Sequence, residues 1–121
     1  MEMNSIFEKF GIVTDLAVEA HSLVRGDAQT EIPGVIESKE KFDIAEVTTI
    51  IIENPAAGSL MGKAPGTYIT IDTPGLREND PPLHDKISEI LASKIETLLK
   101  NLNIADDAEI LLVGLGNWSA T

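Results

Sequence analysis

The longest regular pattern in this sequence is an apolar stripe within residues 81–102. Its members recur every three or four positions, which places side chains on one face of an α-helix; they are Ile87, Ile90, Leu91, Ile95, Leu98, Leu99 and Leu102. Asn79 or Asp80 can cap this helix, and prolines fit its first turn. Because a stripe of this size needs a partner surface, we expect sheet strands to cover it.

A short continuous apolar run, residues 109–115, follows a polar loop at Asp106 and Asp107. Such a run is typical of a strand that is buried on both faces. A helix followed by this kind of strand indicates a parallel α/β sheet. Residues 116–121 contain no helix that would cover the strand, so we expect that the chain is truncated.

The first half of the chain predicts a helix and a β-hairpin. The helix spans residues 15–24 and ends at Gly26, with Thr14 as its cap, and its apolar face consists of Leu16, Ala20, Leu23 and Val24. Residues 31–37 are expected to be extended, and the β-branched residues 47–52 predict a strand. The polar residues 38–41 are the expected hairpin turn.

Two shorter elements complete the prediction. Residues 56–61 can form one helical turn within a stretch rich in glycine and proline, and residues 68–72 alternate as a strand does. That strand is expected to stop at Pro74 and Gly75. The fold class is therefore α/β, with an N-terminal hairpin, a long helix and a buried C-terminal strand.

Composition excludes several classes of protein. Twenty acidic against nine basic residues give a net charge of −11, which repels nucleic acid and anionic membranes. The chain has no cysteine and only two histidines, so no metal site or disulfide framework is expected. No window approaches the roughly twenty apolar residues of a membrane span, and the N-terminus lacks the features of a signal peptide. A cytoplasmic protein is expected.

Two glycine-containing turns are candidate sites. Gly114, Gly116 and Asn117 follow the predicted buried strand, where glycines let backbone amides approach a ligand; a simple tight turn remains the alternative. Asp72 to Gly75 is similar to the magnesium-side motif of GTPases. The nearest phosphate-loop candidate, residues 58–64, is one residue short and has Ala64 where serine or threonine is required, so a proline-glycine turn is the better interpretation.

Most other polar residues are interpreted as ordinary surface. This group comprises the carboxylates Glu37, Glu40, Asp80, Asp85, Glu89 and Glu96, and the histidines His21 and His84. A catalytic pair of carboxylates requires two groups that share a desolvated pocket, which one sequence does not reveal. Trp118, the only tryptophan, is expected to pack in the core or at an interface, with lining of a site as the alternative.

Five short blocks occur in the order found in the spore germination proteases: residues 14–20 (TDLAVEA), 32–36 (IPGVI), 65–70 (PGTYIT), 74–78 (PGLRE) and 113–118 (VGLGNW). Together they span nearly the whole chain, which therefore resembles the N-terminal part of that family. The resemblance implies an endopeptidase that degrades small acid-soluble spore proteins during germination and is made as a self-processing zymogen. The family's cut falls here between Asp15 and Leu16, so residues 1–15 would be the propeptide and 16–121 the start of a single α/β protease domain.

The resemblance also implies where the chemistry lies. The family's fold is similar to that of hydrogenase maturation proteases, so the resemblance implies a partial phosphorylase/hydrolase-like fold for this chain. Its Gly-x-Gly-Asn turn leads to two proposed catalytic aspartates, the first in a Thr-Pro-Asp sequence whose threonine matches Thr121. Both aspartates would then lie beyond this chain, which would be inactive alone. The family assembles as a tetramer and implies no cofactor.

Two other functions remain open at this stage. A non-enzymatic acidic module would use the turn at Gly114 and the loop after Met61 to bind a basic peptide. A degenerate nucleotide-binding domain would use residues 72–75 and would be stabilised by GTP with magnesium. We expect no such stabilisation.

Overall fold

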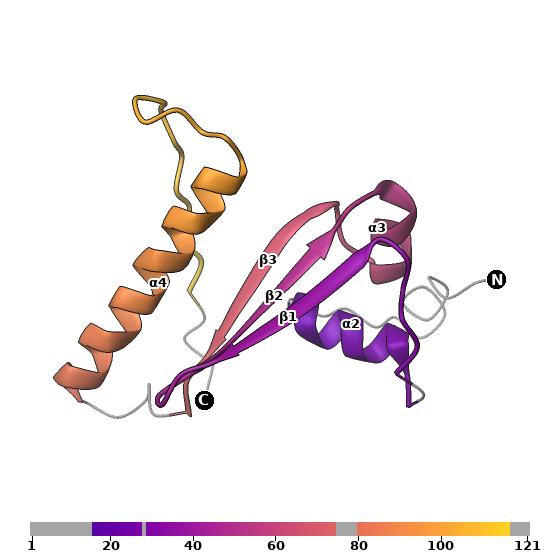
Figure 1. The fold of residues 1–121 in the computed structure, drawn as a ribbon, viewed down its shortest axis with the longest axis horizontal. Coiled ribbons are helices and arrows are strands. Elements are labelled where there is room, and N and C mark those ends of the chain that lie inside the picture. The colour runs from indigo at the N-terminus through magenta and orange to yellow at the C-terminus, as the bar shows by residue number, and fades with distance from the viewer. Residues whose placement is uncertain (1–15, 28, 75–79, 117–121) are drawn as a thin grey trace.

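A three-stranded antiparallel sheet is the centre of this computed structural model, which describes residues 16–27, 29–74 and 80–116. The strands β1 (Val35–Lys41), β2 (Glu46–Ile52) and β3 (Gly66–Asp72) lie in that order, so β1 and β3 are its edges. The helices α2 (Ala17–Arg25) and α3 (Pro55–Met61) cover one face, and α4 (Pro81–Asn101) lies over the other (Figure 1). The result is a three-layer α/β arrangement.

The predicted hairpin is confirmed, but its turn was placed four residues too early. Residues 38–41 belong to β1, and the chain turns at 42–45, where the Phe42 amide donates to the Ala45 carbonyl at 2.8 Å. The polar residues of β1 look like a turn in sequence because β1 is an edge strand with exposed side chains. Charged residues there protect the edge from pairing with other chains.

One face of the sheet and the two shorter helices enclose the core. Alternate residues of β2 point to this face, so Ile50 and Ile52 are almost fully buried. They pack with the apolar face of α2 and with α3; the core consists of Ala17, Ala20, Val24, Ile32, Ile50, Ile52, Ala57 and Met61. The predicted face of α2 is therefore partly wrong: Leu16 and Leu23 are exposed, and Ala17 and His21 are buried instead.

The helix α3 begins and ends at residues that suit those positions. The Asn54 side chain accepts a hydrogen bond from the Ala57 amide at 2.9 Å, and Pro55 occupies the first turn. Gly34 lies against this cap with φ +84°, and a Cβ at Gly34 would come within 2.6 Å of Asn54 Nδ2. Only glycine fits there, because the backbone is left-handed and the space is filled.

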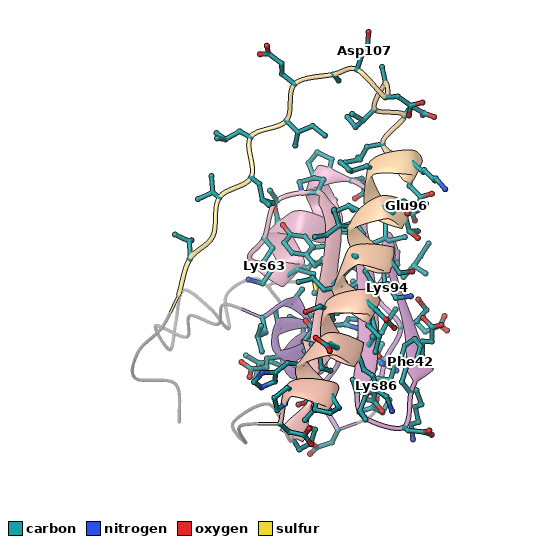
Figure 2. The ribbon with its side chains drawn as sticks, turned by 90° about the vertical axis from the view of Figure 1, so that its left-hand side faces the viewer. Phe42, Lys63, Lys86, Lys94, Glu96 and Asp107 are labelled. Atoms are coloured by element: carbon teal, nitrogen blue, oxygen red, sulfur yellow. The ribbon has the colours of Figure 1, made fainter. Side chains whose placement is uncertain are left out.

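The predicted long helix is confirmed as α4, with Asp80 as its cap: its carboxylate accepts from the Leu83 amide at 3.3 Å. Lys94 reaches across the sheet to pair with Glu40 of β1. Figure 2 shows α4 in front of the sheet, and a small groove of about 200 Å³ between them is lined by Ile69, Ile71, Leu91, Lys94, Ile95 and Leu98. No residue of α4 is buried, so its apolar stripe is only half covered.

The predicted C-terminal strand does not form. Residues 109–116 are extended but pair with no strand among the described residues, and Leu111 and Leu115 are 88% and 93% exposed. The expected parallel sheet is therefore wrong for this chain, since every described strand pair is antiparallel. An apolar run becomes a strand only when a neighbouring edge supplies hydrogen bonds.

Candidate functional site

The predicted cleavage point lies where the described structure begins. Asp15 and the rest of the predicted propeptide, residues 1–15, lie outside the described residues, as does the predicted cap Thr14. Leu16 has an extended backbone (φ −97°, ψ 127°) and is 42% exposed. Its carbonyl accepts a hydrogen bond from the Ala20 amide at 3.1 Å, so it is the last residue before the helical turn. Exposed, extended chain of this kind is accessible to a protease.

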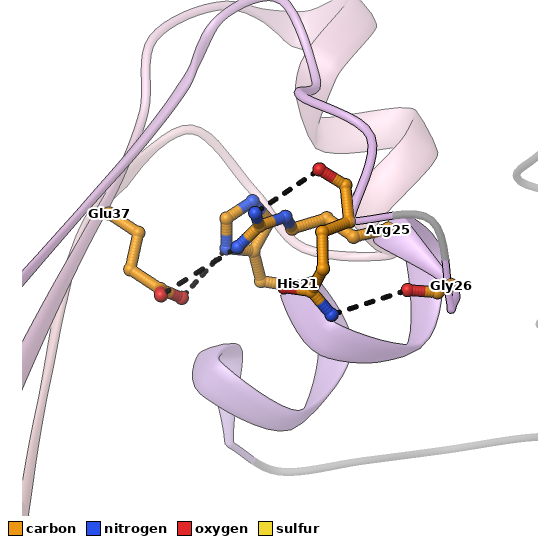
Figure 3. Close-up of polar contacts among 5 residues, drawn as sticks. His21, Arg25, Gly26 and Glu37 are labelled. Atoms are coloured by element: carbon orange, nitrogen blue, oxygen red, sulfur yellow. Dashed lines mark hydrogen bonds and ion pairs between the residues drawn. The ribbon is translucent and has the colours of Figure 1, made fainter.

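His21 joins α2 to the sheet, contrary to the prediction of an ordinary surface or boundary histidine. It is only 4% exposed, and its Nδ1 lies 2.8 Å from Oε1 of Glu37 on β1 (Figure 3). Because a carboxylate only accepts, Nδ1 is the donor. Glu37 is half-buried rather than solvated, which corrects its prediction as well. The buried imidazole is satisfied by this bond.

Arg25 extends the same contact at the end of α2. Its Nη1 lies 3.9 Å from Oε2 of Glu37, and its Nη2 donates to the Gln29 carbonyl at 3.3 Å. Gln29 in turn donates from Nε2 to the Gly26 carbonyl at 3.4 Å (Figure 3). The carboxylate of Glu37 thus holds both the middle and the end of α2 against β1.

These side chains border a groove with a volume of about 620 Å³. Its lining residues are His21, Arg25, Glu31, Ile32, Pro33, Val35, Ile36 and Glu37. A histidine hydrogen-bonded to a carboxylate can act as a general base, but it needs a nucleophile within reach. The described lining residues include no serine, threonine or cysteine, and the contacts of His21 and Arg25 with Glu37 form an anchor for α2.

The contact between His21 and Glu37 was missed because sixteen residues separate the two partners and no local motif joins them. One signal was present in the sequence. His21 lies four residues after Ala17 and three before Val24, so it shares a helix face with two small apolar residues. A polar residue on that face requires a partner across the interface.

The predicted glycine turn is open in this structure. Gly114 and Gly116 lie in the exposed segment, and an added Cβ at either position would meet no atom within 4 Å. Asn117, Trp118 and Thr121 lie outside the described residues. Among the residues that the structure describes, no other predicted site residue lies at this turn, and the role of the turn stays a prediction.

The remaining candidates behave largely as expected. Asp72 is exposed at the end of β3, and Gly75 lies outside the described residues. The Gly58 amide bonds to the Asn54 carbonyl within α3, so this stretch does not form a phosphate-binding loop. The surface prediction is confirmed for Glu40, Asp85, Glu89, Glu96 and His84, whereas Asp80 is half-buried as a helix cap.

Comparison with known proteins identifies the family. The family model described as "Germination protease" matches residues 13–121. This chain belongs to the germination protease family. Curated germination proteases from Bacillus cereus, Bacillus mycoides and Bacillus thuringiensis are 38%, 37% and 36% identical over 115 residues. Each alignment covers 93% of this chain and 31% of the relative, so the chain spans about a third of the length of these germination proteases.

The family resemblance read from the five blocks is therefore confirmed, and the family is a peptidase. No solved structure matches the chain, so the likeness to hydrogenase maturation proteases remains a prediction. None of the helices described has the length and hydropathy needed to span a lipid bilayer. Within the described ranges, no three histidine or acidic side chains are grouped as a metal site would require.

Proposed function

We propose that this chain supplies the N-terminal third of an endopeptidase that degrades small acid-soluble spore proteins during germination. The observation that carries the proposal is the family match over residues 13–121. The order of the five sequence blocks agrees with it. The proposed protein works in the cytoplasm of the developing and germinating spore as a homotetramer, without a cofactor, nucleic acid or membrane.

The proposed enzyme is a zymogen that removes residues 1–15 by cutting between Asp15 and Leu16. Two features support this assignment. Leu16 is exposed and extended, so the bond before it is accessible. The helix that follows is anchored through His21 and Arg25 to Glu37, so the part of the domain after the cut keeps its place once the propeptide leaves.

Catalysis is assigned to two aspartates that the resemblance places beyond Thr121. One carboxylate would activate water, while the other stays protonated beside its neighbour's charge and polarises the peptide carbonyl. Gly114, Gly116 and Asn117 would line this site. The 121-residue chain contributes structure to the proposed site but none of its acids, so it has no activity alone.

The test compares the chain alone with a chimera in which it replaces the matching 115 residues of the Bacillus cereus relative. We expect the chimera to cleave a purified small acid-soluble spore protein and the chain alone to leave it intact. Cleavage by the chain alone would refute its inactivity. An inactive chimera that has native circular dichroism and the tetramer size would refute the proposed function.

The cleavage point is tested separately by mass spectrometry of the processed chimera. We expect a new N-terminus at Leu16, and we expect Leu16→Asp to slow its appearance. Leu23→Asp is the matched control, because Leu23 is similarly exposed but lies within α2. Processing at another bond, or equal slowing by both variants, would contradict the assignment.

A further inference from the structure

The groove beside α2 follows the open edge of β1. β2 pairs with one side of β1, and no described strand pairs with the other. The groove is lined by Val35 and Glu37 and also by Ile36, whose side chain points to the opposite face of the sheet. Because both faces of β1 contribute, the groove runs along the edge of the strand. Its volume of about 620 Å³ falls within the usual range of ligand sites, roughly 300–1,000 Å³.

Two hydrogen bonds of the hairpin show which backbone groups of β1 are free. The Glu53 amide donates to the Gly34 carbonyl, and the Phe42 amide donates to the Ala45 carbonyl; both bonds are 2.8 Å long and join directly opposite residues. In an antiparallel pair, residues bonded to the partner alternate with residues that face away from it. The even-numbered residues of β1 therefore bond to β2, and the odd-numbered residues direct their amides and carbonyls to the open side.

Three residues of β1 offer both backbone groups at this open edge. They are Glu37, Lys39 and Lys41, since the amide of Val35 already donates to the Ile32 carbonyl at 3.0 Å. Within the part of the chain that the structure describes, the backbone groups of these three residues have no hydrogen-bond partner. An extended peptide can pair with such an edge, and its main-chain hydrogen bonds then supply the affinity.

Arg25 has unused hydrogen-bonding capacity in the same groove. Its contacts are long, 3.9 Å to Glu37 and 3.3 Å to the Gln29 carbonyl, and its Nε is enclosed with no partner among the described residues (Figure 3). A guanidinium makes its strongest contact with a carboxylate, which accepts two parallel hydrogen bonds. Because His21 is already bonded to Glu37, Arg25 is the group that an acidic ligand would engage.

The lysines along this edge also favour an acidic strand. Lys41 has only a distant contact of 3.9 Å with Glu46, and Lys39 has no ion pair within the described ranges. Opposite charges on neighbouring strands stabilise their pairing. Glu31 lines the groove but is exposed, so water screens its charge. The net charge of −11 opposes an acidic ligand, but salt screens charges beyond about 8 Å, and the nearby cations therefore dominate.

We infer that the open edge of β1 binds an extended acidic peptide segment of another protein. The peptide backbone pairs with Glu37 and Lys39, and an acidic side chain on one face reaches Arg25. The next side chain points to the other face, where an aliphatic residue packs on Ile36, which is 49% exposed. The inference concerns binding alone and does not rest on the proposed function.

Two labelled peptides test this surface on the 121-residue chain by fluorescence anisotropy. One peptide alternates valine with aspartate, and the other has asparagine in place of each aspartate. We expect the aspartate peptide to bind at least about tenfold more tightly, as a charged contact with Arg25 requires. Added salt should weaken its binding, whereas salt would strengthen it if the net charge of the chain dominated. Equal affinities, no binding of either peptide, or tighter binding in salt would overturn the inference.

Matched proline substitutions locate the site. Lys39→Pro removes an amide that faces the open side of β1 and breaks no bond to β2. Thr67→Pro is the control, because β2 alternates between its two neighbours and the odd-numbered residues of β3 therefore face the open side of β3. We expect Lys39→Pro to weaken binding about tenfold and Thr67→Pro to leave it unchanged. Equal weakening by the two variants, with circular dichroism unchanged, would overturn the inference.

The role of Arg25 is tested by the preference for aspartate over asparagine. Arg25→Met should abolish this preference, and Arg25→Lys should restore part of it, because lysine keeps the charge but not the planar fork. The ratio of the two affinities is informative even where a variant lowers stability, since both peptides meet the same protein. An unchanged ratio in Arg25→Met would reject the assignment.

The same titration in the chimera shows whether the edge stays open in the longer protein. We expect a similar affinity there. Loss of binding in a folded chimera would show that the rest of the protease covers the edge, and it would overturn the inference. Binding by a chimera without peptidase activity would uphold the inference even though the proposed function fails.

Discussion

Residues 16–74 and residues 80–116 both carry large aliphatic side chains, but only the first region encloses them. In the first, Met61 and Ala20 are fully buried and Ile50 is 1% exposed. In the second, α4 has no buried residue and the run 109–115 lies in water. The difference teaches that burial depends on available partners. The hairpin, α2 and α3 bury one another's side chains, whereas α4 covers only part of the other sheet face and the run pairs with no described strand.

The largest effect is expected when an aliphatic side chain is truncated in each of the two regions. Ile50→Ala should lower the free energy of unfolding of the 121-residue chain by about 2–5 kcal/mol, since it leaves a cavity. Leu111→Ala should change it by less than about 0.5 kcal/mol, because Leu111 is exposed. Urea unfolding followed by circular dichroism measures both, and similar losses would show that the run is buried in solution.

A second comparison uses glycines. Gly34→Ala should lower the free energy of unfolding by about 2 kcal/mol, because the left-handed backbone is strained by a side chain and the new Cβ meets Asn54. Gly114→Ala should be close to neutral in the same chain, since nothing lies near it. The same unfolding experiment decides, and a neutral Gly34→Ala would mean that the α3 cap is not packed as described.

The anchor of α2 provides a third comparison within one strand. Glu37→Ala should lower the free energy of unfolding by about 1.5 kcal/mol, because it removes the hydrogen-bond acceptor of a buried histidine. Glu40→Ala breaks only an exposed pair with Lys94 and should cost less than about 1 kcal/mol. Proton NMR of the His21 ring would show whether its environment changes only in the first variant.

The smallest effect is expected on the surface of α4. A hydrogen bond from Lys100, reinforced by that residue's charge, lowers the pKa of Glu96, and the same contact raises the pKa of Lys100. The pair therefore stabilises the helix between these two titrations, and its contribution is lost as the pH falls through the pKa of Glu96 or rises through that of Lys100. Glu96→Gln should remove the acid-side part of this dependence.

Thermal unfolding of Glu96→Gln between pH 3 and pH 7 checks this prediction. Because both groups are fully exposed, we expect only a slight difference from the natural chain, and added salt should reduce it further. An equal pH dependence in the variant and the natural chain would show that the pair contributes nothing.

The sequence predicted those helices and strands that depend on interactions within a single segment. The stripe of α4 and the β-branched residues of β2 predicted both elements within a few positions, because periodicity and side-chain branching act within one segment. The turn of the hairpin was misplaced because the exposed edge strand β1 has the composition of a loop. The run 109–115 was predicted as a strand because its apolar composition indicates burial. A segment is buried as a strand, however, only when the edge of a neighbouring strand is available to pair with it.

Less of the candidate site than of the fold could be predicted from the sequence. The helical pattern placed Leu16 inside the helix on its apolar face, whereas the structure shows it before α2 and exposed. The cut beside Leu16 came from the family resemblance and stays a prediction. The contact of His21 with Glu37 depends on how α2 lies on the sheet, which no local pattern specifies. The family, in contrast, was recognised because its short blocks keep their order regardless of folding.

The edge of β3 that no described strand pairs with also affects the tendency of this chain to aggregate. An apolar run without proline beside an unpaired strand is the composition from which copies of a protein stack into fibrils. Asp106 and Asp107 precede the run and Glu109 is its first residue, so charges guard its N-terminal end, and the net charge of −11 keeps copies apart. Low ionic strength therefore keeps copies of the chain from associating, whereas concentrated salt screens the repulsion between them and favours precipitation.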